Sequence, residues 1–87
     1  MLRVERSANG EVTLRLSGRM HGENIAQLEE LLRSEATGHR IVLDLKDVTL
    51  VNDEAVSFLS RCEADGITLR NCPAYIREWI TRQQRGS

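Results

Sequence analysis

The side chains that could carry chemistry in this 87-residue chain include four carboxylates within the eleven residues from 44 to 54. They are Asp44, Asp47, Asp53 and Glu54. Such a cluster could form an acid/base pair or hold a divalent cation. Each member also suits a structural role, because the last two favour the start of a helix, Asp47 a turn and Asp44 the end of a strand. We therefore expect neither a catalytic site nor a metal site here.

The histidines and cysteines lack the spacing of a reactive or metal-binding site. His21 and His39 have no metal-ligand spacing to Cys62 or Cys72, and the cysteines are too far apart for a Cys-x-x-Cys pair. No serine or cysteine stands at a recognisable spacing from a histidine, and no glycine-rich phosphate loop occurs. We expect two free, partly buried thiols, a solvated His21, no cofactor and no enzyme activity.

Composition and charge narrow the function classes further. Lys plus Arg number 12 against 13 Asp plus Glu, a net charge of -1, which argues against sequence-independent binding of nucleic acid. No apolar run reaches the roughly 18 residues of a membrane span, and no secretory signal is recognisable, so we expect a cytoplasmic protein without membrane insertion. The length fits one domain over residues 1–87.

Two features near the C-terminus leave alternatives open. Residues 66–87 hold four Arg against one Glu, 4 minus 1 or +3, which either steers an acidic partner or forms a solvated helix face. Tyr75 and Trp79 stand four residues apart, a spacing typical of packing on a helix and compatible with a partner-binding surface.

The N-terminal half predicts two strands and a helix. Apolar residues alternate over 2–6 and 12–16, and Asn9-Gly10 between them favours a tight antiparallel hairpin. After a loop over 18–22, the apolar period changes to that of a helix, which we place from Asn24 to a stop at Gly38. Asn24 with Gln27 resembles a capping box.

The C-terminal half predicts two more strands and two more helices. Residues 41–45 are nearly continuous in apolar character, which indicates a central strand covered on both faces. A helix beginning at Asn52 or Asp53 and ending at Gly66 follows, then a short strand over 67–69. Pro73 suits the first position of a last helix, and residues 83–87 are expected to be a frayed tail. The order β-β-α-β-α-β-α predicts an α/β fold, a mixed, mostly parallel four-stranded sheet with helices mainly on one face.

This order of elements resembles the STAS domain, the fold of bacterial anti-sigma factor antagonists and of the cytoplasmic tails of sulfate transporters. The resemblance rests on three stretches that cover most of the chain. They are Leu16-Ser17-Gly18 after the second strand, Ile41-Val42-Leu43-Asp44-Leu45 followed by Val48-Thr49-Leu50-Val51, and Leu69-Arg70-Asn71-Cys72-Pro73 before the last helix. It implies a STAS-like fold and a regulatory role.

In that family the second helix typically opens with Asp-Ser-Ser-Gly, and a serine there is phosphorylated by a partner kinase that is also an anti-sigma factor. The four matching positions here read Asn52, Asp53, Glu54 and Ala55, so Glu54 stands at the phosphoacceptor position and offers no hydroxyl. A kinase-driven switch that phosphorylates a serine is therefore impossible at this position. Glu54 either imitates the phosphorylated form or marks a lost switch.

The resemblance implies a non-enzymatic interaction module that offers the start of this helix to a protein partner. The expected contact residues are Asn52, Asp53, Glu54, Ala55, Ser57 and Phe58. The partner would be an anti-sigma factor of the kinase-like class. The alternatives are a STAS subunit docked to an ATP-driven lipid transporter, or a domain that binds a nucleotide or another small ligand, although two carboxylates at the helix start would repel phosphate. The oligomeric state is not predictable from the residues.

Overall fold

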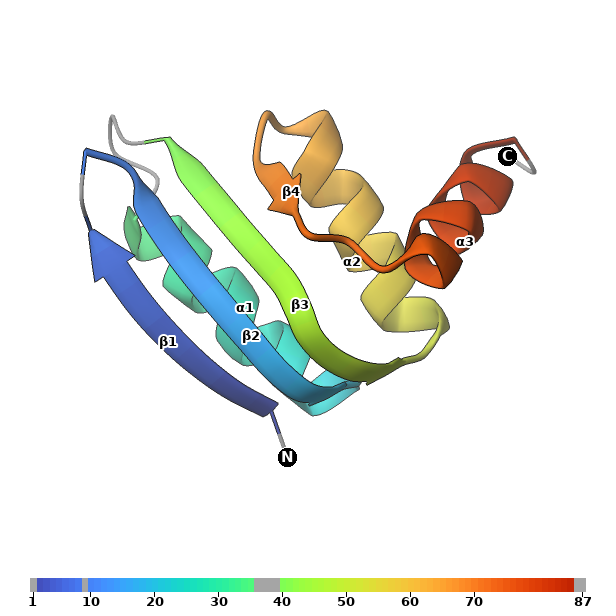
Figure 1. Ribbon diagram of the computed structural model, residues 1–87, viewed down its shortest axis with the longest axis horizontal. Helices are drawn as coiled ribbons and strands as arrows, with labels where there is room; N and C mark the ends of the chain where they lie inside the picture. Colours follow the sequence, from blue (N-terminus) through green and yellow to red (C-terminus); the bar gives the residue numbers. More distant parts are fainter. Residues whose placement is uncertain (1, 9, 36–39, 86–87) are drawn as a thin grey trace.

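A computed structural model describes residues 2–8, 10–35 and 40–85, which form four strands and three helices (Figure 1). In chain order the elements are β1 (Leu2–Ala8), β2 (Val12–Met20), α1 (Gly22–Glu35), β3 (Ile41–Val51), α2 (Asp53–Ala64), β4 (Thr68–Arg70) and α3 (Ala74–Arg85). The predicted order is confirmed. The predicted residues Asn9, Gly38 and His39 lie outside the described part of the chain.

The four strands form one sheet in the order β1-β2-β3-β4. β1 pairs antiparallel with β2, whereas β2 with β3 and β3 with β4 pair in parallel, so the sheet is mixed and mostly parallel as predicted. α1 and α2 lie behind the sheet in Figure 1, and α3 packs against α2 beyond the short strand β4. Parallel pairing requires helical crossovers, which explains why helices follow β2 and β3.

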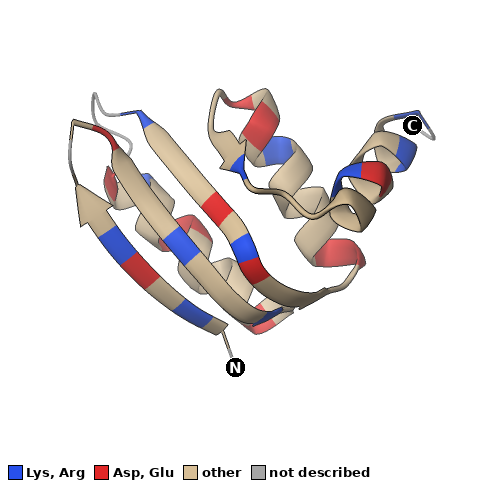
Figure 2. Ribbon diagram, viewed as in Figure 1, with Lys and Arg blue, Asp and Glu red and all other residues tan. Residues whose placement is uncertain are grey.

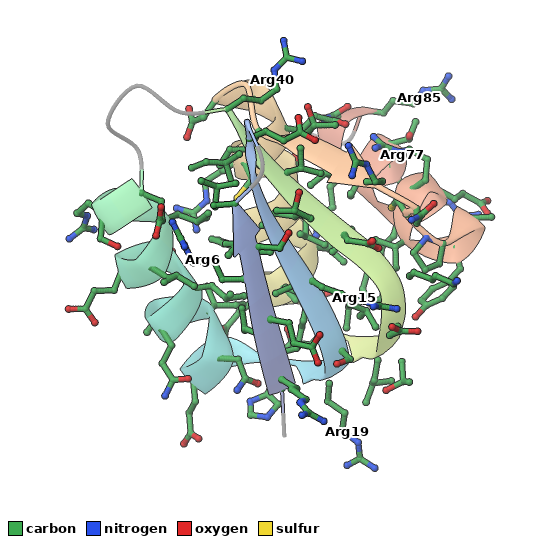
Figure 3. The ribbon with its side chains drawn as sticks, turned by 60° about the vertical axis from the view of Figure 1, so that its left-hand side comes forward. Arg6, Arg15, Arg19, Arg40, Arg77 and Arg85 are labelled. Atoms are coloured by element: carbon green, nitrogen blue, oxygen red, sulfur yellow. The ribbon has the colours of Figure 1, made fainter. Side chains whose placement is uncertain are left out.

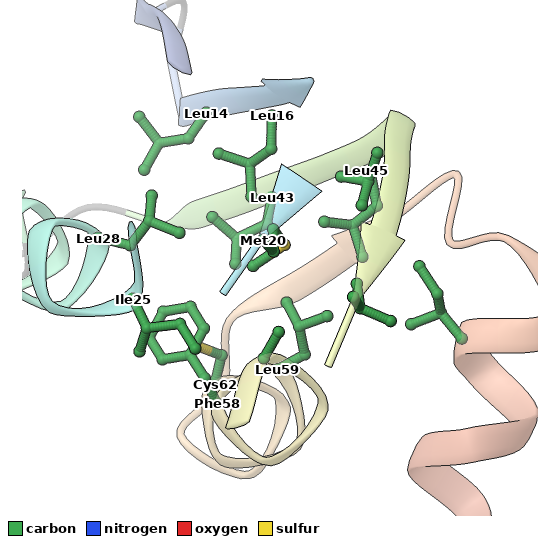
Figure 4. Packing of buried hydrophobic residues seen from close by; sticks show 14 of the residues in the cluster. Leu14, Leu16, Met20, Ile25, Leu28, Leu43, Leu45, Phe58, Leu59 and Cys62 are labelled. Carbon is green, nitrogen blue, oxygen red and sulfur yellow. The ribbon is translucent and has the colours of Figure 1, made fainter. Parts of the chain in front are cut away.

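The core lies between the sheet and its two covering helices. Leu14 and Leu16 of β2 and Leu43 and Leu45 of β3 are completely buried on this face. Figure 4 shows them opposite the apolar sides of α1 and α2. The alternation read from residues 12–16 therefore identified the buried face of β2 correctly.

Among the described elements, no helix lies over the opposite face of the sheet (Figure 1), which corrects the expectation that β3 is covered on both faces. Val42 on this face is nonetheless only 1% exposed. Arg70 on β4 pairs with Glu11 before β2 at 3.0 Å, so this ion pair spans β3 near Val42. Asp44 also lies on this face, because it alternates with the buried Leu43 and Leu45, and Figure 2 marks charged residues along β1, β2 and β3. Long polar side chains thus replace a helical layer.

Several boundaries differ from prediction because tertiary pairing extends the strands. β2 continues to Met20 and β3 to Val51, across residues expected to form loops, because the two strands pair along this whole stretch. α1 begins at Gly22, and the amides of Asn24 and Ile25 donate to the His21 carbonyl oxygen, so Asn24 is not the cap.

The C-terminal boundaries also shift. β4 spans Thr68–Arg70, one residue later than predicted, and α3 begins one residue after Pro73. The expected frayed tail from Gln83 is wrong up to Arg85, because α3 continues and Gln83 and Gln84 hydrogen-bond to side chains of α2. No helix in the described ranges is long and apolar enough to span a membrane.

Candidate functional site: the start of helix α2

The strongest candidate surface lies where β3 ends and α2 begins. Asn52 is the N-cap, with extended backbone angles (φ -116°, ψ -178°), and its Oδ1 accepts a hydrogen bond from the Ala55 amide at 2.9 Å. Asp53 and Glu54 follow in the first turn and are exposed. Their negative charges favour this end of the helix, where unpaired amides carry a partial positive charge. The predicted helix start is therefore confirmed.

Glu54 also lies against the first residue of α1. A Cβ placed on Gly22 would lie 2.7 Å from Oε2 of Glu54, so the absence of a side chain at Gly22 leaves room for the carboxylate. The N-termini of α1 and α2 are thus adjacent, with the Glu54 carboxylate beside both. This places a fixed negative charge at the position where the family resemblance puts a phosphoserine.

Two of the six residues expected to contact a partner belong to the core. Ala55 is completely buried and Phe58 is 3% exposed, and Figure 4 shows Phe58 pointing toward Ile25 of α1. A partner would have to unpack the core to reach either of them, so we remove both from the predicted surface. Ser57 is exposed, and its Oγ donates to Oε1 of Gln83 on α3 at 3.1 Å.

Sequence reasoning missed Leu50, which lies two residues before the cap. Leu50 is 56% exposed, whereas its neighbour Val51 is buried. Within residues 46–51, two exposed residues are followed by one buried residue, and this pattern occurs twice. The strand is therefore irregular here and does not alternate between its two faces. The register of β2 with β3 shifts in the same stretch, beside Arg19 and Leu50. Residues 48–51 are four consecutive uncharged residues, and this run could have indicated that not all of their side chains fit inside the core.

The other groups considered for chemistry have structural roles. Asp44 Oδ1 accepts from the Lys46 amide at 3.0 Å and from Asn71 at 3.3 Å, and Asp47 pairs with Arg15 at 3.3 Å. Asp44 and Asp47 are thus occupied by contacts within the open face of the sheet. Among the described residues, no group of three or more His, Cys, Asp or Glu side chains could hold a metal ion.

Both cysteines are free, as expected. Burial raises the pKa of the Cys62 thiol to about 12, and burial also raises the pKa of the half-buried Cys72 thiol. Both groups are therefore protonated near neutral pH, and a protonated thiol is a poor nucleophile and a poor metal ligand.

The basic C-terminal segment is largely neutralised by ion pairs. Arg70 pairs with Glu11 at 3.0 Å, Arg77 with Glu63 at 2.8 Å and Arg82 with Glu78 at 2.7 Å. Of the two alternatives for residues 66–87, these ion pairs favour a solvated helix face over a surface that steers an acidic partner.

Tyr75 and Trp79 line a shallow depression on α3 together with Glu78, Arg82 and Gln83. Tyr75 is 49% exposed, and Trp79 packs partly against the core. A role of Tyr75 and Trp79 in binding a partner stays a prediction.

Comparison with known proteins identifies the family. The sequence profile described as "Mlab, STAS domain" matches residues 4–83, which is nearly the whole chain. The chain belongs to the STAS domain family. Among curated proteins, none matches it.

Solved structures support the fold. One similar structure is an uncharacterised DUF3478-family protein with a SpoIIAA-like fold from Shewanella loihica PV-4, with a TM-score of 0.59 and 15% identity over 98% of this chain and 78% of that one. Another is a protein named Mglu, with a TM-score of 0.62 and 27% identity over 83% of this chain. This STAS domain corresponds to only 19% of the Mglu chain.

Proposed function

We propose that this STAS domain is a non-enzymatic docking module whose partner binds the start of α2. The surface comprises Leu50, Asn52, Asp53, Glu54 and Ser57, and we call it the α2 surface. The observation that carries the proposal is the exposure of Leu50, a large apolar side chain, beside two exposed carboxylates. A large apolar side chain that is exposed beside polar groups can serve as the anchor of a protein interface.

The chemistry of the α2 surface defines what a partner must offer. A partner needs a small apolar pocket for Leu50 and basic side chains opposite Asp53 and Glu54. Glu54 carries a permanent charge and no hydroxyl, so binding would be constitutive or controlled from the partner's side. The protonated thiols and the structural roles of Asp44 and Asp47 support a function without catalysis.

The leading partner is an anti-sigma factor of the kinase-like class, because the α2 surface lies at the helix that the family resemblance assigns to such contacts. In this case Glu54 either imitates the phosphorylated form or marks a lost switch. Both this partner and the alternative would place the domain in the cytoplasm.

The second candidate is an ATP-driven lipid transporter, to which the domain would dock as an accessory subunit. It is the alternative that the family resemblance raised, and the profile match over residues 4–83 supports a STAS domain in either role.

Binding of purified partners tests the proposal. The kinase-like anti-sigma factor or the transporter ATPase encoded nearest this gene is titrated into the domain by calorimetry. We expect Leu50→Asp to weaken binding at least tenfold, about 1.4 kcal/mol. Thr68→Asp is the control, since it adds the same charge at an exposed, uncharged residue of β4, outside the α2 surface, and should leave affinity unchanged. No binding by either partner, or equal binding by the Leu50 variant, contradicts the proposal.

Restoring a hydroxyl separates the two partner classes. Glu54→Ser creates an acceptor at the start of α2, and a kinase-like anti-sigma factor with ATP should phosphorylate this variant and not the wild-type position. Mass spectrometry of the intact variant measures the added phosphate. Binding to the ATPase without phosphorylation of the variant would favour the transporter.

A further inference from the structure

β1 is the outermost strand of the sheet and pairs on one side only. It is seven residues long and has β2 as its neighbour, so alternate backbone N–H and C=O groups face outward without a strand partner in the described part of the chain. Figure 1 shows no element outside it. The other edge, β4, has three residues and packs against α2. A long unpaired edge is the natural site for adding a strand.

We propose that β1 pairs antiparallel with β1 of a second copy of this chain, which joins the two sheets into one of eight strands. A two-fold axis perpendicular to the sheet relates the two copies, so the helix-covered faces stay on the same side. Under this symmetry each residue pairs with one on its own face. Leu2, Val4 and Arg6 pair with Gly18, Leu16 and Leu14 of β2 and therefore point to the helix side, whereas Arg3 and Glu5 point to the open side.

Charge selects one register for this pairing. Three symmetric registers pair five or more residues of β1, centred on Val4, Glu5 or Arg6. The second sets Glu5 opposite Glu5, and like charges directly opposite destabilise a strand pair. The third sets Arg6 opposite Arg6, where each guanidinium is already bound to Glu35 of its own chain at 2.7 Å, so it crowds two cations and gains no complementary pair. Only the register centred on Val4 avoids this conflict. In this register Arg3 of each copy lies opposite Glu5 of the other, which gives two pairs of opposite charges. Leu2 of each copy lies opposite the aliphatic stem of Arg6 of the other.

The apolar residues of β1 fit the same register. Val4 is 37% exposed although it lies on the helix side, because α1 does not cover this edge completely. Leu2 is half-buried. Pairing around Val4 brings the two exposed valines together and shields them from water. The contact is small, so the dimer should be weak.

The start of α2 follows β3, which is separated from the β1 edge by β2 (Figure 1). Pairing through β1 therefore leaves the α2 surface free, and this inference does not depend on the proposed function.

Sedimentation equilibrium of the wild-type chain between roughly 20 μM and 1 mM tests the proposal, because a monomer of 9.9 kDa should approach twice that mass as concentration rises. Arg3→Glu sets two pairs of like charges across the axis and should raise the dimer dissociation constant roughly tenfold. Arg85→Glu makes the same change in net charge on α3, far from β1 (Figure 3), and should leave dimerisation unchanged.

A mixture of two variants gives the decisive result. Arg3→Glu and Glu5→Arg should each dimerise poorly alone, because each sets like charges across the axis. Their mixture sets two acidic side chains of one strand opposite two basic side chains of the other and should form a heterodimer. Circular dichroism confirms that each variant is folded before mixing. A wild-type chain that stays monomeric at roughly 1 mM overturns the proposal, and so does a dimer that Arg3→Glu leaves intact or a mixture that fails to associate.

Discussion

Replacing Asn52 by alanine should destabilise the protein by about 1 kcal/mol, because the change removes the only side-chain cap found at the start of α2 in the described structure. Asn52 Oδ1 accepts the Ala55 amide at 2.9 Å, and a methyl group has no acceptor to replace it. Ala55 is completely buried, so water would have difficulty in reaching the freed amide. The expected loss therefore lies toward the middle of the measured range for caps, about 0.5–2 kcal/mol.

The effect should be visible as a shift in melting temperature. For 87 residues the entropy of unfolding near 60 °C is about 0.18 kcal/mol/K, so a loss of about 1 kcal/mol lowers Tm by about 5–6 °C. Thermal unfolding followed by circular dichroism at 222 nm measures this shift. Asn52→Asp keeps an acceptor in the same place and should stay within about 1–2 °C of the wild type.

Ser34→Ala is the matched control for loss of a side-chain hydrogen bond to backbone. The Ser34 hydroxyl donates to the Leu31 carbonyl oxygen inside α1 and caps nothing, so its removal should be nearly neutral. A Tm for Asn52→Ala equal to that of the wild type would refute the capping argument. Equal damage from Asn52→Asp and Asn52→Ala would refute it as well, because only the latter lacks the acceptor.

Three further outcomes are expected. Gly22→Ala and Glu54→Ala should be non-additive in urea unfolding, since a Cβ at residue 22 would collide with the Glu54 carboxylate and Glu54→Ala removes that carboxylate. Additivity within about 0.3 kcal/mol would argue against the close approach of Gly22 and Glu54. Cys62 should resist iodoacetamide at pH 8 in the folded protein, and rapid labelling of the folded protein would contradict this. The free energy of unfolding should also fall as pH rises from 9.0 toward about 12, because the Cys62 thiol ionises at lower pH in the unfolded chain than in the folded one. The hydrogen bond from Arg77 lowers the pKa of Glu63, so their pair stabilises the fold above pH 4.5 and this contribution is lost as pH falls through the lowered pKa. Urea unfolding at pH 7 and pH 3 measures how much the free energy of unfolding falls in acid, and Glu63→Gln should reduce this fall by less than about 1 kcal/mol, because both side chains of the pair are more than a third exposed. An unchanged difference between the two pH values would count against the pair.

The start of α2 was predictable because its signals are local. Asparagine followed by two acidic residues and an apolar period of three to four specifies a helix start, and the structure has the cap at the first of the two residues predicted for it. The order of strands and helices was predictable for the same reason, since each period extends over only a few neighbouring residues.

The ends of β2 and β3 were not predictable in this way. Residues 18–20 and 46–51 lack the alternation of isolated strands, and they are strands because β2 and β3 pair with each other along this stretch. Gln83 and Gln84 read as a polar tail, yet side chains of α2 provide their hydrogen-bond partners.

By itself, the sequence determined the order of elements, the buried face of β2 and the capped start of α2, since periodicity and capping depend on residues close together in the chain. It also determined that residue 54 is a glutamate and has no side-chain hydroxyl. Only the tertiary structure decided which of these residues a partner can reach. Ala55 and Phe58 are buried because α2 packs on the sheet and on α1, whereas Leu50 is exposed where the register of the strands shifts, and both outcomes depend on contacts between elements distant in sequence.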